Sequence, residues 1–294
     1  MGVSRTAVAL ATCFFLRYPV RLADRTGVRD RTTSPEKKRM KFGFIVPTGT
    51  TDQILDLAQE IEAAGWDGFF YWDGIGGQAW DPWAMLAAAA VKTEHVTLGA
   101  MIFPLSRRRP WKVVHEALTV DHLSRGRLVL PVGLGALDNG AFSRVRPEAT
   151  DRKERAERLD ETLEILERAW TGEPVTFNGK HYGIDAMAFE PRPIQQPRIP
   201  VWVVAAWPRP KSMARAARWD GIIPTISADP FRALTPEEIQ EIRDWMATHR
   251  HDGTPGEIVL EGVSPAEDPA WVESTLQPLA EAGATWWIES RWEA

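Results

Sequence analysis

The sequence MKFGFIVPTGTTDQILDLAQEIEAAGWDGFFYW, residues 40–72, contains a strand, a helix and a second strand in close succession. The apolar and aromatic runs at 42–46 and 68–72 predict the two strands. Between them, apolar residues recur every three or four positions over 52–64, and Gly65 stands where a helix C-cap belongs. Because strand–helix–strand units build parallel sheets, this stretch predicts an α/β fold.

The same alternation extends through the rest of the chain. It predicts eight strands, at 42–46, 68–72, 97–103, 128–133, 201–205, 221–225, 257–261 and 285–288. It also predicts helices near 52–64, 81–93, 110–124, 151–170, 210–218, 235–248 and 269–282. Eight strands within residues 40–294 match a TIM (β/α)8 barrel, which takes about 250 residues, and a doubly wound sheet is the alternative.

Two features depart from a plain barrel. Residues 176–183 alternate around Asn178-Gly179, a strong signal for a β-hairpin, and the proline-rich stretch 191–200 follows. We therefore expect a hairpin insertion between the fourth and fifth strands. The sequence ends at Ala294, a few residues after the eighth strand, so the eighth helix of the barrel is expected to be missing.

Composition restricts the classes of function. The chain has a net charge of −5, which gives no basic surface for nucleic acid, and its one cysteine excludes an intramolecular disulfide framework and a thiolate metal cluster. Its apolar runs fall short of the roughly 18 residues that a membrane span needs. We therefore expect a cytoplasmic protein with neither nucleic acid nor a membrane as partner.

Residues 1–39 differ in character from the rest of the chain. They carry nine Lys and Arg residues against three Asp and Glu residues. The apolar run at 7–16 resembles the core of a signal peptide, but only Arg5 precedes it and no cleavage site follows. We expect residues 1–39 to be a disordered extension and residues 40–294 to form the barrel domain.

The sequence contains none of the common catalytic motifs. A glycine-rich dinucleotide motif is absent after the first strand, no Walker A, G-x-S-x-G or C-x-x-C motif occurs, and no metal site is expected. Ligands of TIM barrels bind at the carboxyl ends of the strands. Those ends combine small residues, aromatic rings and few charges, which favours a pocket for a flat ring; they are residues 72–74, 103–106, 133–139, 205–207 and 286–289.

A set of short motifs occurs in an order typical of one family. They are AAGWDGFF at 63–70, Trp72-Asp73, TLG at 97–99, Arg109-Pro110, DHLSRGRL at 121–128, GLG at 133–135 and RWDG at 218–221. Together they resemble the bacterial luciferase-like flavin-dependent monooxygenases and their deazaflavin (coenzyme F-420)-dependent relatives. The resemblance extends over residues 40–289 and implies a luciferase-like TIM barrel that binds reduced FMN or coenzyme F-420.

The resemblance also implies where such a cofactor binds. It implies a non-prolyl cis peptide between Ala100 and Met101, behind the central ring of the cofactor. The phosphate belongs at a helix N-terminus after the fifth strand, because free N–H groups there favour an anion. Arg107 would hold a phosphate or the acidic tail of a deazaflavin. The other candidate cofactor residues are Gly133, Gly135, Ala205, Ala206, Trp207, Lys211 and Ser212.

The acid–base residues of some family members are replaced in this chain. The family's dehydrogenases of sugars and alcohols place a histidine after the strand-two Trp-Asp and a glutamate after the strand-four Gly-x-Gly. Gly74 and Ala136 stand at these places, and neither can transfer a proton, which disfavours that reaction. Trp72, Asp73 and Asp138 remain as candidate catalytic residues.

The turn before the fourth strand is expected to have a structural role. Asp121, His122 and Arg127 belong to this turn, which lies at the mouth of the barrel opposite the ligand. We expect Asp121 to pair with a guanidinium.

Three functions remain open. The first is a monooxygenase that uses reduced flavin and O2 on a small apolar or aromatic substrate in a dry pocket. It would need a separate flavin reductase, because no NAD(P)H site is visible. The second is a deazaflavin-dependent oxidoreductase that passes a hydride to an unsaturated or carbonyl substrate, and the third is a non-catalytic cofactor-binding protein. The family resemblance implies a homodimer.

Overall fold

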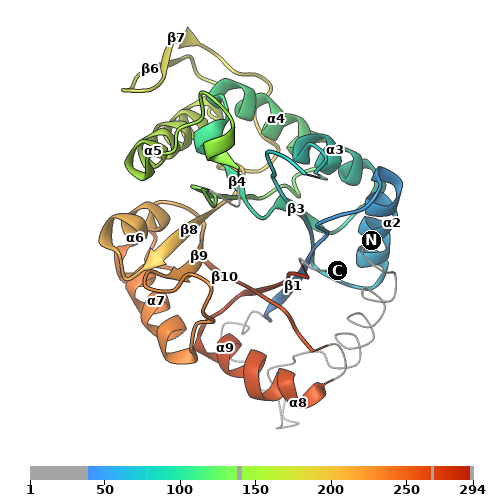
Figure 1. Ribbon diagram of the computed structural model, residues 1–294. Helices are drawn as coiled ribbons and strands as arrows, with labels where there is room; N and C mark the ends of the chain where they lie inside the picture. Colours follow the sequence, from blue (N-terminus) through green and yellow to red (C-terminus); the bar gives the residue numbers. More distant parts are fainter. Residues whose placement is uncertain (1–38, 78, 138–140, 266–267, 292–294) are drawn as a thin grey trace, which may run out of the picture.

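The computed structural model describes residues 39–77, 79–137, 141–265 and 268–291. Parallel strands form a ring that helices surround (Figure 1). Around the ring the strand order is β3-β2-β1-β11-β10-β9-β8-β5-β4. The strands are β1 (Lys41–Ile45), β2 (Gly68–Tyr71), β3 (Thr97–Ala100), β4 (Phe103–Pro104), β5 (Leu130–Gly133), β8 (Val201–Trp207), β9 (Gly221–Ile226), β10 (Glu257–Gly262) and β11 (Trp286–Glu289).

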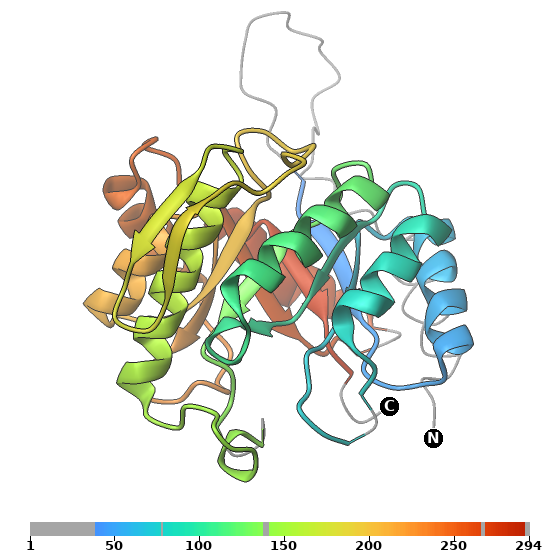
Figure 2. The same cartoon turned by 90° about the horizontal axis from the view of Figure 1, so that it is seen from above.

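Helices follow the strands and cover the outside of the ring (Figure 2). They are α2 (Thr51–Ala63), α3 (Pro82–Lys92), α4 (Pro110–Leu123), α5 (Arg152–Ala169), α6 (Pro210–Ala217), α7 (Pro236–His249), α8 (Pro269–Trp271) and α9 (Gln277–Ala282). A π-helical turn joins α8 to α9, and short 3₁₀ helices occur at η1 (Leu105–Arg107) and η2 (Phe142–Arg144). All seven predicted helices are present, although the last is divided.

The ring closes at the third predicted strand. This segment is split into β3 and β4, and both parts pair with the segment around β5. Leu98 of β3 pairs with Leu128, and Phe103 of β4 pairs with Val132. The expected TIM barrel is thus confirmed, and the doubly wound sheet is wrong, because an open sheet would leave β3 and β5 as separate edges.

Strand alternation separates two apolar cores. Successive side chains on a strand point to opposite faces, so every second residue points into the barrel. Phe70, Trp202 and Trp286 fill the barrel interior together with aliphatic residues from six other positions. The residues between them, such as Phe69 and Trp287, pack outward against the helices. A strand residue that belongs to the inner core therefore points into the barrel, and one that belongs to the outer core points toward the helices.

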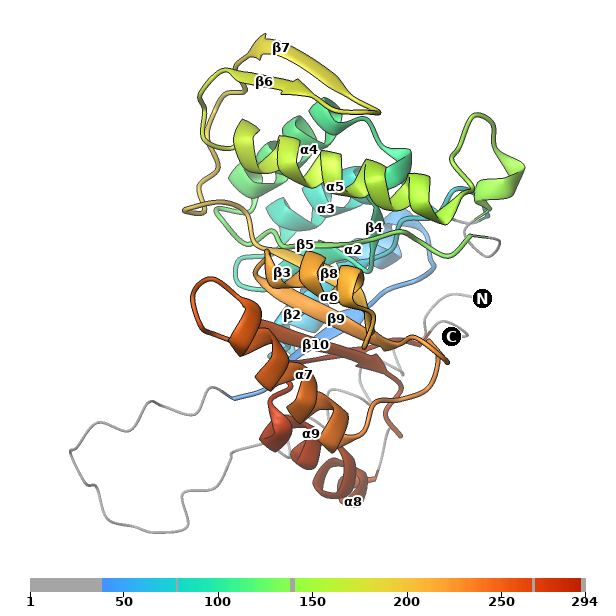
Figure 3. The ribbon, with the colours of Figure 1, turned by 90° about the vertical axis from the view of Figure 1, so that its left-hand side faces the viewer.

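A two-stranded hairpin is inserted between β5 and β8, as predicted. Its strands are β6 (Val175–Asn178) and β7 (Gly183–Met187), which pair antiparallel. The hairpin packs on α5 outside the barrel (Figure 3).

The described part of the chain ends at Arg291 and contains no helix after β11. At its start, Arg39 donates a hydrogen bond of 2.9 Å to the carboxylate of Asp67.

The turn after α4 has a structural role at the amino ends of the strands. Arg127 donates to four backbone carbonyls and to the hydroxyl of Thr93. Asp121 accepts from the backbone N–H of Ile194 at 2.7 Å and from the side-chain amide of Gln195 at 2.8 Å. The expectation that Asp121 pairs with a guanidinium is therefore wrong, since this carboxylate anchors the proline-rich connector to α4.

Among the described residues, no helix is long and apolar enough to span a bilayer.

Candidate active site

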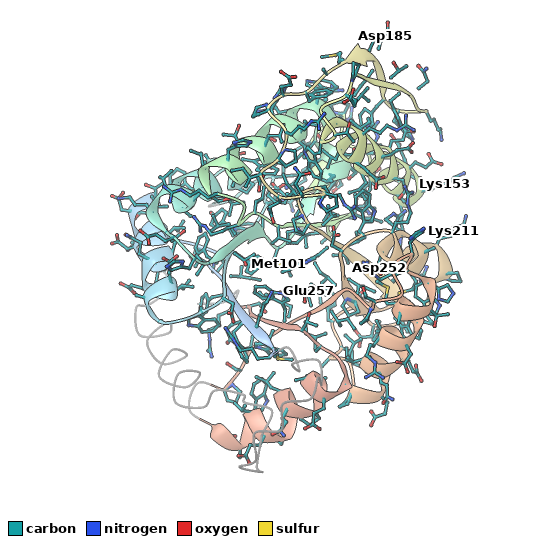
Figure 4. The ribbon with its side chains drawn as sticks, turned by 180° about the vertical axis from the view of Figure 1, so that it is seen from behind. Met101, Lys153, Asp185, Lys211, Asp252 and Glu257 are labelled. Atoms are coloured by element: carbon teal, nitrogen blue, oxygen red, sulfur yellow. The ribbon has the colours of Figure 1, made fainter. Side chains whose placement is uncertain are left out.

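Residues after β3, at the carboxyl end of β5 and in the middle of β8 form an apolar wall inside the barrel. Met101, Ile102 and Val204 contribute its side chains, and Met101 lies within the strand ring (Figure 4). Gly133 stands between them. A Cβ atom there would lie 2.5 Å from Cδ1 of Ile102 and 3.1 Å from Cβ of Val204, so the wall requires a glycine at this position. The wall supplies a smooth apolar surface for a flat ring.

A non-prolyl cis peptide bond lies in this wall, between Met101 and Ile102. The predicted position, between Ala100 and Met101, is wrong by one residue. Ala100 still belongs to β3, where it pairs with Tyr71 and is fully buried in the outer core. The strand thus remains regular through Ala100 and departs from the ladder only after it.

The end of β8 leads directly into α6. Ala205, Ala206 and Trp207 are the last residues of the strand, whereas the sequence predicted a strand end at Ala205. Ala205 faces the outer core, and Ala206 and Trp207 are half-buried. The backbone N–H of Ala206 donates to Oγ of Ser212 at 3.0 Å. Ser212 therefore holds the strand end against the first turn of the helix.

The N-terminus of α6 offers a cationic place for an anion. Pro210 is the first helical residue, and no side chain caps the helix. Arg209 and Lys211 are exposed on either side of it, and no carboxylate of the described residues pairs with them. Pro210 has no N–H, and the N–H of Ser212 donates to the carbonyl of Arg209, so the helix offers the N–H of Lys211 and the positive end of its dipole. With the charges of Arg209 and Lys211, these groups fit the predicted phosphate position.

A buried carboxylate lies between two arginines at the end of β2. Asp73 accepts hydrogen bonds from Arg107 and, at 2.8 Å, from Nε of Arg108. Arg107 also donates to the backbone carbonyl of Asp73. Burial by itself lowers the pKa of Arg108, but the hydrogen bond and charge of Asp73 outweigh it and keep that pKa above its ordinary value. Both arginines are thus held in place by Asp73, and the carboxylate is occupied by them.

A second arginine arrangement supports the loop after β5. Gly135 has a φ of +75°, and a Cβ there would meet Phe142 and Pro104 at 3.0 Å. Nη1 of Arg155 donates to the carbonyls of Leu134 and Gly135, both at 3.1 Å. The guanidinium of Arg155 lies 5.1 Å from the centre of the Phe142 ring. Burial and the nearby Arg152 lower the pKa of Arg155.

The remaining predicted residues lie around the same mouth. The indole of Trp72 donates to the carbonyl of Pro47. A Cβ at Gly74 would lie 2.6 Å from the Trp72 ring, so this place has no room for the family's histidine without movement of the indole. Ala136 is exposed on the loop after β5. Asp138 lies outside the described residues.

Sequence reasoning missed Glu261, near the end of β10. Val259 points into the barrel, whereas Ile258 and Leu260 belong to the outer core. Strand alternation therefore directs Glu261 to the inner face, and it is exposed at the carboxyl mouth. Glu261 also pairs in register with the inward-facing Ile288. Counting alternate positions from Val259 would have found this carboxyl group.

A family model described as luciferase-like monooxygenase matches residues 31–286. The chain belongs to the luciferase-like monooxygenase family. The match extends from before β1 to the first residue of β11, and includes the wall of Met101, Ile102, Gly133 and Val204 and the start of α6. Among the described residues, no group of three His, Cys, Asp or Glu side chains is arranged to hold a metal ion.

Curated relatives of this luciferase-like chain carry the name F420-dependent glucose-6-phosphate dehydrogenase. One from Amycolatopsis mediterranei is 37% identical over 167 residues, which is 53% of this chain and 48% of the relative. One from Nakamurella multipartita is 31% identical over 186 residues, which is 60% of this chain and 53% of the relative. The chain thus spans about half the length of the curated relatives it matches.

Solved structures share the fold at low sequence identity. The coenzyme F420-dependent tetrahydromethanopterin reductase of Methanopyrus kandleri has a TM-score of 0.67 and 17% identity, over 85% of this chain and 92% of that one. A monooxygenase from Streptomyces bottropensis has a TM-score of 0.62 and 24% identity, over 84% and 80% of the two chains. The same barrel therefore occurs in proteins named for a deazaflavin and in proteins named for oxygen chemistry.

Proposed function

We propose that this protein binds a reduced deazaflavin of the coenzyme F-420 type and transfers a hydride to a small unsaturated or carbonyl compound. One observation carries the choice of cofactor. The carboxyl mouth has a basic rim at η2 and at the starts of α5 and α6, and a deazaflavin of this type has an acidic tail beyond its phosphate. The rim consists of Arg144, Arg146, Arg152, Lys153, Arg209 and Lys211.

Four residues of the rim lie at the starts of two neighbouring helices, α5 and α6. Arg215 of α6 donates to Asp160 of α5 at 2.8 Å, so the two helices lie side by side. Figure 4 shows Lys153 and Lys211 on the same edge of the molecule. Within the described residues, Lys153 has a carboxylate only at 3.9 Å, and no ion pair involves Arg144, Arg146 or Arg152. Surface charges this weakly paired leave a positive potential at the mouth, which attracts an acidic tail.

The chain's own residues have separable roles in this proposal. Met101, Ile102 and Val204 exclude water behind the ring, and Gly133 keeps their surface flat. The N-terminus of α6 and Lys211 hold the phosphate. The bound cofactor supplies the hydride. Glu261 places a carboxyl group at the mouth, where the proton that must accompany hydride transfer is exchanged with the substrate.

The substrate class follows from what is missing. The curated relatives are named for glucose 6-phosphate, but Gly74 and Ala136 stand where the family's sugar dehydrogenases have a histidine and a glutamate. We therefore propose a substrate reduced by the bound cofactor rather than a sugar oxidised by it. A cytoplasmic location and a homodimer are part of the same proposal.

A monooxygenase that uses reduced FMN is the second candidate. The apolar wall favours it, because an oxygenated flavin needs a site from which water is excluded. This candidate requires a separate flavin reductase as partner. It differs from the first in the consumption of O2. Binding of either cofactor without turnover would instead identify a non-catalytic binding protein.

Two titrations test the proposal. Coenzyme F-420 and FMN are each added to the full chain, and the absorbance of each chromophore is followed. We expect saturable binding of F-420, and Lys211→Gln should weaken it by about tenfold, because a charge-assisted contact to the phosphate is lost. Lys92→Gln, which removes an exposed lysine at the end of α3, is the matched control and should bind like the parent.

Turnover is then measured without oxygen. The reduced cofactor is mixed with 2-cyclohexen-1-one as an unsaturated carbonyl probe, and its reoxidation is followed. Protein-dependent reoxidation supports hydride transfer. Binding of FMN alone, with O2 consumption when it is reduced, would overturn the deazaflavin proposal in favour of the monooxygenase.

A further inference from the structure

A second pocket lies at the opposite mouth of the barrel, at the amino ends of the strands. It has a volume of about 700 Å³, in the range of small-molecule sites. Figure 4 views the barrel from this side, and Glu257 lies within the strand ring. The lining includes the first residues of four strands, Lys41, Thr97, Glu257 and Trp286. This pocket is separate from the wall at Met101 and Ile102.

Two tryptophans form the floor of this pocket. Trp202 and Trp286 are both inward-facing and buried, and their ring centres are 5.2 Å apart at an angle of 58°. Phe70 closes the floor from inside the barrel, with its ring centre 6.1 Å from that of Trp286. An aromatic floor of this kind suits a flat apolar group, which gains both burial and ring contacts.

Two buried N–H donors at the pocket have no acceptor within the described part of the chain. One is the indole Nε1 of Trp286, whose side chain is 1% exposed. The other is Nη1 of Arg250, whose side chain is 10% exposed. Gly256, with a φ of +69°, lines the pocket beside this nitrogen, and a Cβ there would lie 3.2 Å from it. Buried donors are normally satisfied, so these two indicate an acceptor supplied by a ligand.

The other nitrogens of Arg250 are already bound. Nε and Nη2 donate to the carboxylate of Asp252 at 3.3 and 2.9 Å, and this contact keeps the pKa of Asp252 below its usual value. Asp252 thus fixes the guanidinium, which leaves Nη1 directed along Gly256. The donor is positioned before any ligand arrives.

The remaining charged groups of the pocket have partners of their own. Lys41 lies 5.0 Å over the Trp286 ring and 3.8 Å from Glu257. Asp220 accepts from Arg198 at 3.2 Å and from the backbone N–H of Val201 at 2.9 Å. Glu257 and Asp220 are therefore each matched by a nearby cation.

We propose that this pocket binds an aromatic carboxylate. Its ring would lie on the floor formed by Trp202 and Trp286. Its carboxylate would accept from Nε1 of Trp286 and from Nη1 of Arg250, close to the ammonium of Lys41. Active sites of TIM barrels lie at the other mouth, so this is a binding site in addition to the proposed cofactor site and does not depend on it.

Calorimetric titration of the full chain with indole-3-carboxylate tests the proposal. We expect saturable binding with a dissociation constant of about 1 mM or tighter. Indole-3-carboxamide has the same shape without the charge, and should bind about tenfold more weakly. Arg250→Gln should weaken indole-3-carboxylate by about tenfold, and Trp286→Phe, which keeps an aromatic ring and removes the N–H, should weaken it in the same direction.

Matched variants locate the site. Arg243→Gln removes an arginine from α7 that does not line the pocket, and should leave the affinity unchanged. Lys211→Gln at the carboxyl mouth should do the same. No saturable binding to the parent, equal binding of acid and amide, or an affinity that Lys211→Gln lowers and Arg250→Gln does not, would each overturn the proposal. Thermal unfolding of Trp286→Phe and Arg250→Gln verifies that both variants are folded.

Discussion

Arg127 and Arg155, at opposite mouths of the barrel, differ in how completely they are hydrogen-bonded. At the amino mouth, Arg127 donates to five oxygens, four of which are backbone carbonyls. At the carboxyl mouth, Arg155 holds two carbonyls, but its Nε has no partner among the described residues. At the N-terminus of α6, Arg209 and Lys211 are exposed and form no ion pair within the same residues.

This difference separates stability from binding. A donor that is satisfied inside the fold contributes to stability, whereas one left without a partner costs about 1–3 kcal/mol when buried. Such groups persist where a ligand completes them. The carboxyl mouth therefore has the character of a binding face, and the turn at Arg127 that of a structural one. At the amino mouth, Arg250 and Trp286 also have donors without a partner among the described residues. The pocket that they line therefore has the character of a binding face as well.

The largest effect is expected at Glu261, the inward-facing carboxyl group of the carboxyl mouth. Glu261→Gln removes the group that exchanges a proton with the substrate, so turnover with the reduced deazaflavin and 2-cyclohexen-1-one should fall about 10²- to 10⁴-fold. The affinity for the cofactor should not change. Glu289→Gln is the matched control, because Glu289 ends the neighbouring strand but faces outward. Equal turnover of Glu261→Gln and the parent would remove Glu261 from the reaction.

A stability effect without a binding effect is expected at Arg127. Arg127→Met keeps the apolar stem but leaves five oxygens without their donor, and should lower the free energy of unfolding by about 3 kcal/mol. Urea denaturation measures this, and cofactor affinity of the folded protein should equal that of the parent. Arg218→Met removes an arginine that is 59% exposed and serves as control. A loss of cofactor affinity in Arg127→Met would contradict the separation of the two faces.

The fold was predictable because it follows from local pattern. The periodicities that predict strands at 42–46 and 68–72 also fix which residues enter the core, and the Asn178-Gly179 turn predicts the hairpin between β6 and β7. The break between β3 and β4 was not visible in this way. Residues 98–103 contain no polar side chain, so no change of residue type marks where the strand leaves the ladder after Ala100.

The site was predicted less completely, since its chemistry depends on partners distant in sequence. Asp73 looks like a catalytic carboxylate next to Trp72, but the fold brings Arg107 and Arg108 onto it. Arg155 lies within a helix and has no motif around it, yet it fixes the loop at Gly135. Finding Glu261 requires knowing which side chains of β10 face into the barrel. The alternation of residues along the strand gives this, but a comparison of motifs does not use it.

The smallest effect is expected at Glu289, on the outer side of the carboxyl mouth. Its carboxylate accepts from the backbone N–H of Ser264 at 3.1 Å and from the indole of Trp287 at 3.3 Å, and Arg291 lies 3.0 Å away. Burial nevertheless raises the pKa of Glu289 above its ordinary value, because these contacts do not fully replace water. The folded protein therefore keeps this proton to a higher pH than the unfolded chain.

The sign of the pH dependence follows directly. Between the ordinary pKa of a glutamate and the raised one, the folded state binds more protons, so the free energy of unfolding falls as the pH rises through this window. Glu289→Gln removes this slope, whereas Glu273→Gln, at an exposed position, should keep it. Urea denaturation at a series of pH values measures both. A slope that survives in Glu289→Gln would assign the titration to another group and would contradict this account of the Glu289 carboxylate.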